Sequence, residues 1–193
     1  MCGIIGFVNR GIPKLNINNF TSQALIVNSL RGTDGSGLLL VEENGDISMY
    51  KRPLPGWDLT QLVTTRNIIS SSTPVFGLIH NRAGTNGGNK VETSHPVIHE
   101  HIHLIHNGVV TQLTSIGASW DEHDSTAIAK ALASKTEKEV LELLTGSYAL
   151  IWYNSKDKTF NVARNEERPL YIATAKKNKS AFFSSEDGAL LWL

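Results

Sequence analysis

The side chain with the greatest chemical potential stands at the second position of the chain. Cys2 is the one cysteine among 193 residues, so no disulfide can form within the chain. If Met1 is removed, the thiol and a free α-amine belong to one residue. An amine with a pKa of about 7.7–8.0 can take the thiol proton at neutral pH, and Gly3 would leave room for a substrate. By position alone, Cys2 could equally be an incidental residue in a frayed tail.

Two glycine-rich segments carry arginines. Residues 31–37 (RGTDGSG) have three glycines in seven positions, which is typical of open backbone dihedrals or close packing. Arg31 could grip a carboxylate there, or could be a solvated side chain after a helix end. Residues 80–88 (HNRAGTNGG) follow an apolar stretch, and Arg82 and Thr85 favour a site for an amino-acid carboxylate. The alternative for this second segment is a flexible surface loop.

Two further motifs could complete a site for acyl transfer. The Asn107 amide and the Gly108 N–H could both donate to a developing oxyanion. The commonest use of Asn-Gly, however, is a hairpin turn. Asp124 stands near a predicted helix start, where it could accept from a substrate ammonium or cap the helix.

Histidines at positions 95, 99, 101 and 103 raise the question of a metal. The last three alternate and would share one face of a strand. Because no cysteine or clear set of carboxylates completes a ligand shell, we expect no metal site.

Hydrophobic periodicity and turn signals predict the elements that must position these residues. We expect strands over 3–8, 38–41, 47–51, 74–80, 101–106, 109–113, 147–153, 159–163, 170–174 and 181–184, and helices over 18–30, 121–134 and 135–144. Tight turns are expected at 44–46 and 107–108, a surface loop at 52–60, and core packing for the apolar residues 189–193. This order predicts an α+β chain in which helices cover two sheets.

Composition narrows the class of protein. The 18 basic and 18 acidic residues cancel, which argues against a nucleic-acid partner, and 40% hydrophobic residues suffice for a sizeable core. The length fits one domain. There is no apolar run of the roughly 20 residues that a membrane helix needs, and the N-terminus lacks the pattern of a signal peptide. We therefore expect no membrane association and a reducing, cytoplasmic location.

Taken in order, these segments resemble the glutaminase domain of class II glutamine amidotransferases, a branch of the N-terminal nucleophile hydrolases. The motifs that carry the resemblance are Cys-Gly-Ile-x-Gly at 2–6, Arg-Gly-x-Asp-x-x-Gly at 31–37, His-x-Arg-x-x-Thr-x-Gly at 80–87, His-Pro at 95–96, His-Asn-Gly at 106–108, Gly-x-Tyr-Ala at 146–149, Ala-Arg-Asn with Pro-Leu at 163–170, and Ser-Ser-Glu-Asp at 184–187. A helix-opening Asp124 falls between the His-Asn-Gly and Gly-x-Tyr-Ala motifs. The likeness covers nearly the whole chain.

The resemblance implies a four-layer αββα sandwich formed by residues 2–193 as a single domain, with no cofactor. It implies that Cys2 attacks the side-chain amide of glutamine, with its own amine as base and then as acid for the leaving ammonia. Water then hydrolyses the thioester. The remaining residues would bind: Asn107 and Gly108 the oxyanion, Arg82 and Thr85 the substrate carboxylate, Asp124 the substrate ammonium, and Arg31 the surroundings of Cys2.

The sequence also departs from one subfamily and leaves alternatives open. In the amidotransferases of hexosamine synthesis, an aromatic residue and a histidine stand where this chain has Ala83 and Asn86. The ammonia could pass to a separate synthase subunit, or the protein could act alone on glutamine or another γ-glutamyl amide. Other possibilities are a catalytically idle amino-acid-binding subunit and a metal-dependent hydrolase that uses the histidines.

Overall fold

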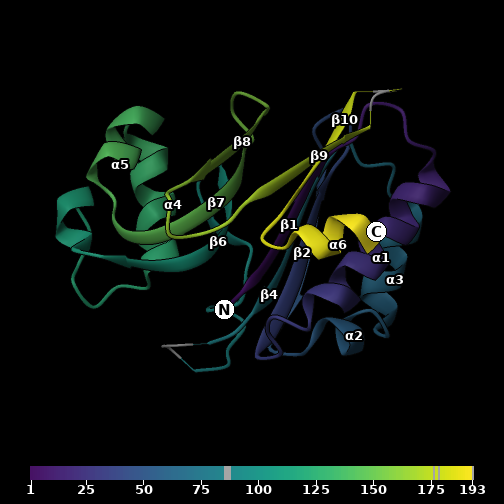
Figure 1. Cartoon of the computed structure of the whole chain (residues 1–193), viewed down its shortest axis with the longest axis horizontal. Helices are drawn as coiled ribbons and strands as arrows, with labels where there is room; N and C mark the ends of the chain where they lie inside the picture. The colour runs from purple at the N-terminus through teal and green to yellow at the C-terminus, as the bar shows by residue number, and fades with distance from the viewer. Residues whose placement is uncertain (85–87, 176, 178, 193) are drawn as a thin grey trace.

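The computed structural model describes residues 1–84, 88–175, 177 and 179–192, and its strands form two antiparallel sheets with helices outside them (Figure 1). The strands are β1 (Gly3–Val8), β2 (Gly35–Val41), β3 (Ile47–Arg52), β4 (Phe76–Arg82), β5 (Val97–His99), β6 (Ile102–Thr111), β7 (Thr145–Asn154), β8 (Thr159–Arg164), β9 (Tyr171–Ala175) and β10 (Ser180–Ser184). The helices are α1 (Lys14–Asn28), α2 (Gly56–Leu59), α3 (Val63–Ser71), the short 3₁₀ helix η1 (Leu113–Ile116), α4 (Asp124–Ser134), α5 (Glu137–Leu143) and α6 (Asp187–Trp192).

The N-terminal strand of the chain, β1, is a central strand of the larger sheet. Its strand order is β3-β2-β4-β1-β10-β9, so β1 lies between β4 and β10 and is antiparallel to both. The apolar run of β1 is buried on both faces, as expected for a central strand. The smaller sheet has the order β5-β6-β7-β8. Cys2 therefore immediately precedes a buried strand that neighbours on both sides hold in place.

Strand alternation divides the core into three clusters. Ile4 and Leu78 of the larger sheet meet Ile105 and Ile151 of the smaller sheet in one shared cluster. The opposite face of the larger sheet packs against α1 and α3, and the opposite face of the smaller sheet packs against α4 and α5 (Figure 1). The predicted mixed α+β class, with two helix-covered sheets, is confirmed.

The expected turn at Asn107-Gly108 is wrong, because β6 runs straight through both residues. β6 pairs with β7 from Ile102 to Thr111 without interruption. A Cβ on Gly108 would lie 2.0 Å from the Ser147 carbonyl oxygen, and its φ is +152°. Glycine is required here by the close approach of β7, which the dipeptide alone does not distinguish from a turn.

Other differences concern the loop at 52–60 and the C-terminal segment. The predicted loop contains α2, and the unpredicted α3 follows it. A Cβ on Gly56 would lie 1.9 Å from the Leu25 carbonyl oxygen, so α2 packs directly on α1.

In α6, Ala189 is buried, whereas Leu191 is 88% and Trp192 is 62% exposed. The expectation of core packing therefore holds for Ala189 but is wrong for Leu191 and Trp192, and Leu193 lies outside the described residues.

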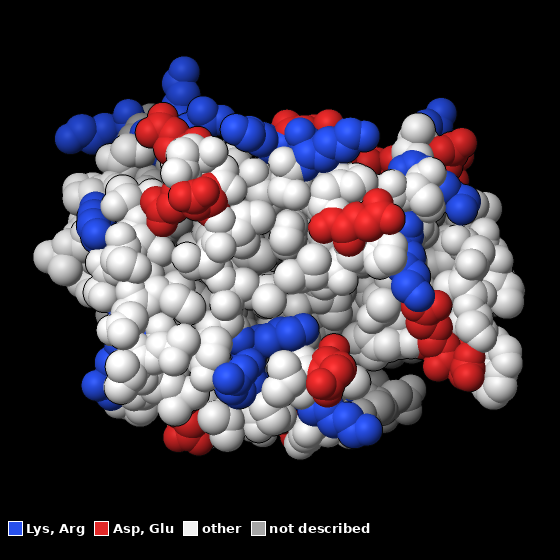
Figure 2. Space-filling model, turned by 180° about the vertical axis from the view of Figure 1, so that it is seen from behind, with Lys and Arg blue, Asp and Glu red and all other residues white. Residues whose placement is uncertain are grey.

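The surface carries no sign of segregated charge on the face drawn in Figure 2, where basic and acidic side chains lie close to one another. This agrees with the zero net charge of the sequence. Within the described part of the chain, no helix combines the length and apolar character needed to cross a membrane.

Candidate active site

A cavity of about 500 Å³ opens at the N-terminal end of β1. It is lined by residues from both sheets and from α4, among them Cys2, Arg82, Asn107, Gly108 and Asp124. The tertiary structure thus brings together five of the seven residues that the sequence analysis singled out. Arg31 does not line this cavity, and Thr85 lies outside the described residues.

Cys2 presents a half-buried thiol at this end of β1. Its Sγ donates to the carbonyl oxygen of Ala83 at 3.6 Å. Burial raises the pKa of the thiol, and the positive charges of the N-terminus and Arg82 partly oppose this effect. A thiol of this kind needs an adjacent base to become a nucleophile. The prediction that Gly3 leaves room for a substrate is wrong. A Cβ there would lie 2.4 Å from Oδ1 of Asn28, so α1 already fills this space.

The segment after β10 anchors the start of β1 and also accounts for Arg31. The Ile4 N–H donates to Ser185 Oγ at 3.1 Å, and the Ser185 N–H donates to the Ile4 carbonyl at 3.0 Å. The next residue, Glu186, forms an ion pair with Arg31. The carboxylate that Arg31 contacts is therefore one of this chain, and a role for Arg31 in the surroundings of Cys2 stays a prediction.

The glycine-rich segment at 31–37 supports the loop that carries Arg82. A Cβ on Gly32 would lie 2.3 Å from the carbonyl carbon of Arg82. The Asp34 N–H donates to the Arg82 carbonyl at 2.9 Å, and Asp34 Oδ2 accepts from the Gly84 N–H at 2.7 Å. Arg82 itself is buried and donates to the Gly88 carbonyl at 2.8 Å. This network fixes both the Arg82 guanidinium and the Ala83 carbonyl beside Cys2.

Asn107 and Gly108 direct donors toward the cavity from neighbouring positions of β6. Asn107 shares the face of Ile105, which packs toward the larger sheet, and its buried Nδ2 has no hydrogen-bond partner among the described residues. The N–H of Val110 donates to Asp124 at 3.2 Å rather than to β7. Since N–H groups two residues apart on a strand point the same way, the Gly108 N–H also faces this open edge. An amide and a backbone N–H are therefore both directed at one region.

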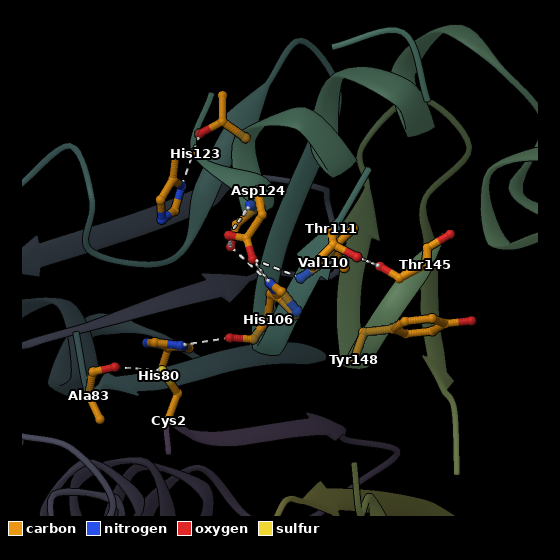
Figure 3. A network of polar contacts seen from close by, with 12 residues as sticks. Cys2, His80, Ala83, His106, Val110, Thr111, His123, Asp124, Thr145 and Tyr148 are labelled. Carbon is orange, nitrogen blue, oxygen red and sulfur yellow. Dashed lines mark hydrogen bonds and ion pairs between the residues drawn. The ribbon is translucent and has the colours of Figure 1, made fainter. Parts of the chain in front are cut away.

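Asp124, the first residue of α4, presents an oriented carboxylate to the cavity (Figure 3). Its Oδ2 accepts from the Val110 N–H, and its Oδ1 accepts from the Ser125 N–H at 2.7 Å. His123, not Asp124, occupies the N-cap position of α4. The carboxylate thus joins α4 to β6 while it remains part of the cavity lining.

The sequence did not predict a cluster of four histidines at the cavity, of which His95, His106 and His123 belong to its lining and His80 packs against them. His80 Nε2 lies 3.1 Å from the His106 carbonyl, and its ring stacks on that of His95 with centroids 4.0 Å apart. The His123 ring lies 5.9 Å from that of His95. Burial lowers the pKa of His80 to about 3 and lowers the pKa of the other three histidines. A polar residue inside an apolar run, as at His80 and His106, is the signal that could have indicated them.

The expected strand face of alternating histidines is absent from the structure. β5 ends at His99 and β6 begins at Ile102, so His101 lies in the connection and His103 on a different strand from His99. His95 belongs to the buried group near the cavity. In the described ranges, no three His, Cys, Asp or Glu side chains lie in an arrangement that could hold a metal ion.

Comparison with known proteins identifies the class that this fold and site define. A family model described as "Glutamine amidotransferase domain" matches residues 89–192, and the chain belongs to this family. Over 99% of its length it is 25% identical to the glutamine--fructose-6-phosphate aminotransferase (isomerizing) of Pectobacterium atrosepticum, and equally so to that of Buchnera aphidicola. The enzyme of the same name from Acidithiobacillus ferridurans is 28% identical over 77% of the chain. In the first two cases the chain spans 33% of the relative's length.

Proposed function

We propose that this protein hydrolyses the side-chain amide of glutamine through a thioester on Cys2, releasing glutamate and ammonia. The observation that carries the proposal is the buried Asn107 amide, whose Nδ2 has no partner among the described residues and which lines the same cavity as the Cys2 thiol. A buried amide donor without a partner is costly for a fold and is expected where charge develops during a reaction. Family membership and the names of the relatives support glutamine as the substrate.

The mechanism begins once Met1 has been removed. The α-amine of Cys2 takes the thiol proton, and Sγ attacks the amide carbon of the substrate. Asn107 Nδ2 and the Gly108 N–H donate to the oxyanion of the tetrahedral intermediate. The protonated amine then gives its proton to the leaving ammonia, and a thioester remains. Water, deprotonated by the same amine, hydrolyses the thioester and regenerates the thiol.

The remaining groups of the cavity would hold the amino-acid part of the substrate. Arg82 is placed to bind the α-carboxylate, and the carboxylate of Asp124 to accept from the α-ammonium. Thr85 is proposed beside Arg82 on the strength of the sequence motif. In this proposal Arg31 does not touch the substrate. Its ion pair with Glu186 stabilises the segment that anchors β1 and thereby the position of Cys2.

The proposal also covers the fold type, the cellular location and the fate of the ammonia. The three clusters of the core support a four-layer αββα sandwich of the N-terminal nucleophile hydrolase type, with residues 2–193 as one domain. The protein would work in the cytoplasm, where the thiol stays reduced. The ammonia would pass to a separate acceptor subunit, or glutaminase activity would be the whole reaction.

Glutamate release by the purified protein tests the proposal. We expect turnover of L-glutamine, complete loss of turnover in Cys2→Ala, and an intact mass that lacks Met1. Unchanged release in Cys2→Ala would overturn the proposed nucleophile. A chain that keeps Met1, binds glutamine and releases no glutamate would instead be an amino-acid-binding subunit. Parallel assays with other γ-glutamyl amides would establish which amide is preferred.

A further inference from the structure

His123 faces the cavity from the start of α4, next to both groups proposed to hold the amino-acid part of the substrate. It lines the cavity together with Arg82 and Asp124. Its Nδ1 lies 3.3 Å from Thr126 Oγ1, which fixes the orientation of the ring. None of the hydrogen bonds within the described ranges involves Nε2, and Figure 3 shows this edge of the ring directed away from α4.

The surroundings of His123 favour a ligand that carries negative charge. Burial lowers the pKa of His123, the carboxylate of Asp124 opposes this, and the positive charges of Arg82 and Lys51 lower the pKa further. The titratable and charged groups that face it are Lys51 from β3, His80 and Arg82 from β4, His95 from the segment between β4 and β5, His106 from β6, and Glu122 and Asp124 from its own segment.

Both acids of this segment have partners within the described residues. The carboxylate of Asp124 is oriented by the N–H groups of Val110 and Ser125, and Glu122 forms an ion pair with Lys130 at 2.6 Å. His95, which is only 3% exposed and lines the same cavity, has no partner for either ring nitrogen among the described residues. This end of the cavity therefore offers donors and positive charge to an incoming anion.

We propose that His123 is a specificity-determining residue that donates from Nε2 to the α-carboxylate of the substrate, beside Arg82. The inference rests on the proposed function, since it assigns this end of the cavity to the amino-acid part of glutamine. It predicts that the protein selects substrates with a free α-carboxylate. A bound carboxylate also favours the charged imidazolium, so binding draws a proton onto His123 at mildly acidic pH.

Equilibrium binding to the catalytically inert Cys2→Ala protein tests this assignment without relying on turnover. The ligands are L-glutamine and L-glutaminamide, in which an amide replaces the α-carboxylate. We expect His123→Leu to weaken L-glutamine binding by about tenfold or more, as for a lost hydrogen bond to a charged group. His123→Gln keeps a donor near the position of Nε2 and should retain most of the affinity. L-glutaminamide should bind weakly and equally to all of these proteins.

The pH dependence of L-glutamine affinity distinguishes direct binding by His123 from a purely structural role. Affinity for L-glutamine should increase as the pH falls from 7.5 to 6, and His123→Gln should abolish this increase. His99→Leu, at the last residue of β5 and outside the cavity, is the matched control and should change nothing.

The outcomes separate this inference from the proposed function. Unchanged affinity for L-glutamine in His123→Leu, or equal loss for both ligands, would overturn the role of His123 whatever the enzyme's turnover. Binding that depends on His123 in a protein whose native form releases no glutamate would support the role of His123 and overturn the hydrolase. Failure of every variant to bind L-glutamine would overturn both.

Discussion

Replacing Asn107 by alanine should separate activity from stability more sharply than any other change at the site. The variant removes one of two proposed oxyanion donors. Loss of one such donor lowers kcat by about 10²–10³, which corresponds to about 2.7–4 kcal/mol of transition-state stabilisation. Binding of L-glutamine to the inert Cys2→Ala protein should change little, because the oxyanion forms only during the reaction.

The expected effect on stability follows from the burial of the same side chain. Asn107 is 1% exposed, and its Nδ2 has no partner in the part of the chain that the structure describes. Truncation leaves a cavity of roughly 40 Å³, which at about 24 cal/mol per Å³ costs about 1 kcal/mol. It also removes an unpaired buried donor, whose burial costs about 1–3 kcal/mol. The free energy of unfolding should therefore stay within about 1 kcal/mol of the native value or rise.

Steady-state glutamate release and urea denaturation of the same preparations measure the two quantities. Asn161→Ala, which truncates an asparagine on β8 outside the cavity, is the matched control and should keep full kcat. A kcat for Asn107→Ala within threefold of the native value would refute the oxyanion role. A large loss of stability would show that the amide serves the fold.

Three further predictions concern the elements that support the site. Gly32→Ala should lower the free energy of unfolding by about 1–3 kcal/mol and raise KM, because its Cβ would collide with the Arg82 backbone, whereas Gly188→Ala, with open space around it, should be neutral in both measurements. Thr136→Ala removes the capping box of α5 and should lower Tm by about 2–4 °C through the loss of about 1 kcal/mol, without altering kcat. His80 has a folded-state pKa of about 3, so the unfolded chain binds more protons below pH 6.5 and stability falls as the pH decreases from there. Between pH 7.5 and 5.5 this single group should cost about 1.4 kcal/mol in urea denaturation, and His80→Gln should reduce the loss by that amount, while an unchanged slope would contradict the buried neutral state.

Local patterns were sufficient for most of the elements. The apolar run of β1 and the turn signal before β3 predicted these two strands to within one residue, because burial and turn chemistry act over a few neighbouring positions. β2 begins at Gly35, three residues before its predicted start. The turn predicted at Asn107-Gly108 was wrong because such patterns are local. What demands glycine there is the carbonyl of Ser147, 39 positions away in the sequence, and no local pattern reports such a contact.

The sequence by itself determined which residue types are available for chemistry: one cysteine after Met1, an asparagine–glycine pair, an arginine at a strand end and an aspartate at a helix start. Residue type sets the acid–base and hydrogen-bonding capacity of each group wherever it lies. Only the tertiary structure decided that Cys2, Arg82, Asn107, Gly108 and Asp124 share one cavity, that Arg31 is paired with Glu186, and that His123 belongs to the same site. Distance, burial and the competition for partners depend on how remote segments pack, and these quantities determine whether a reactive side chain is available for chemistry.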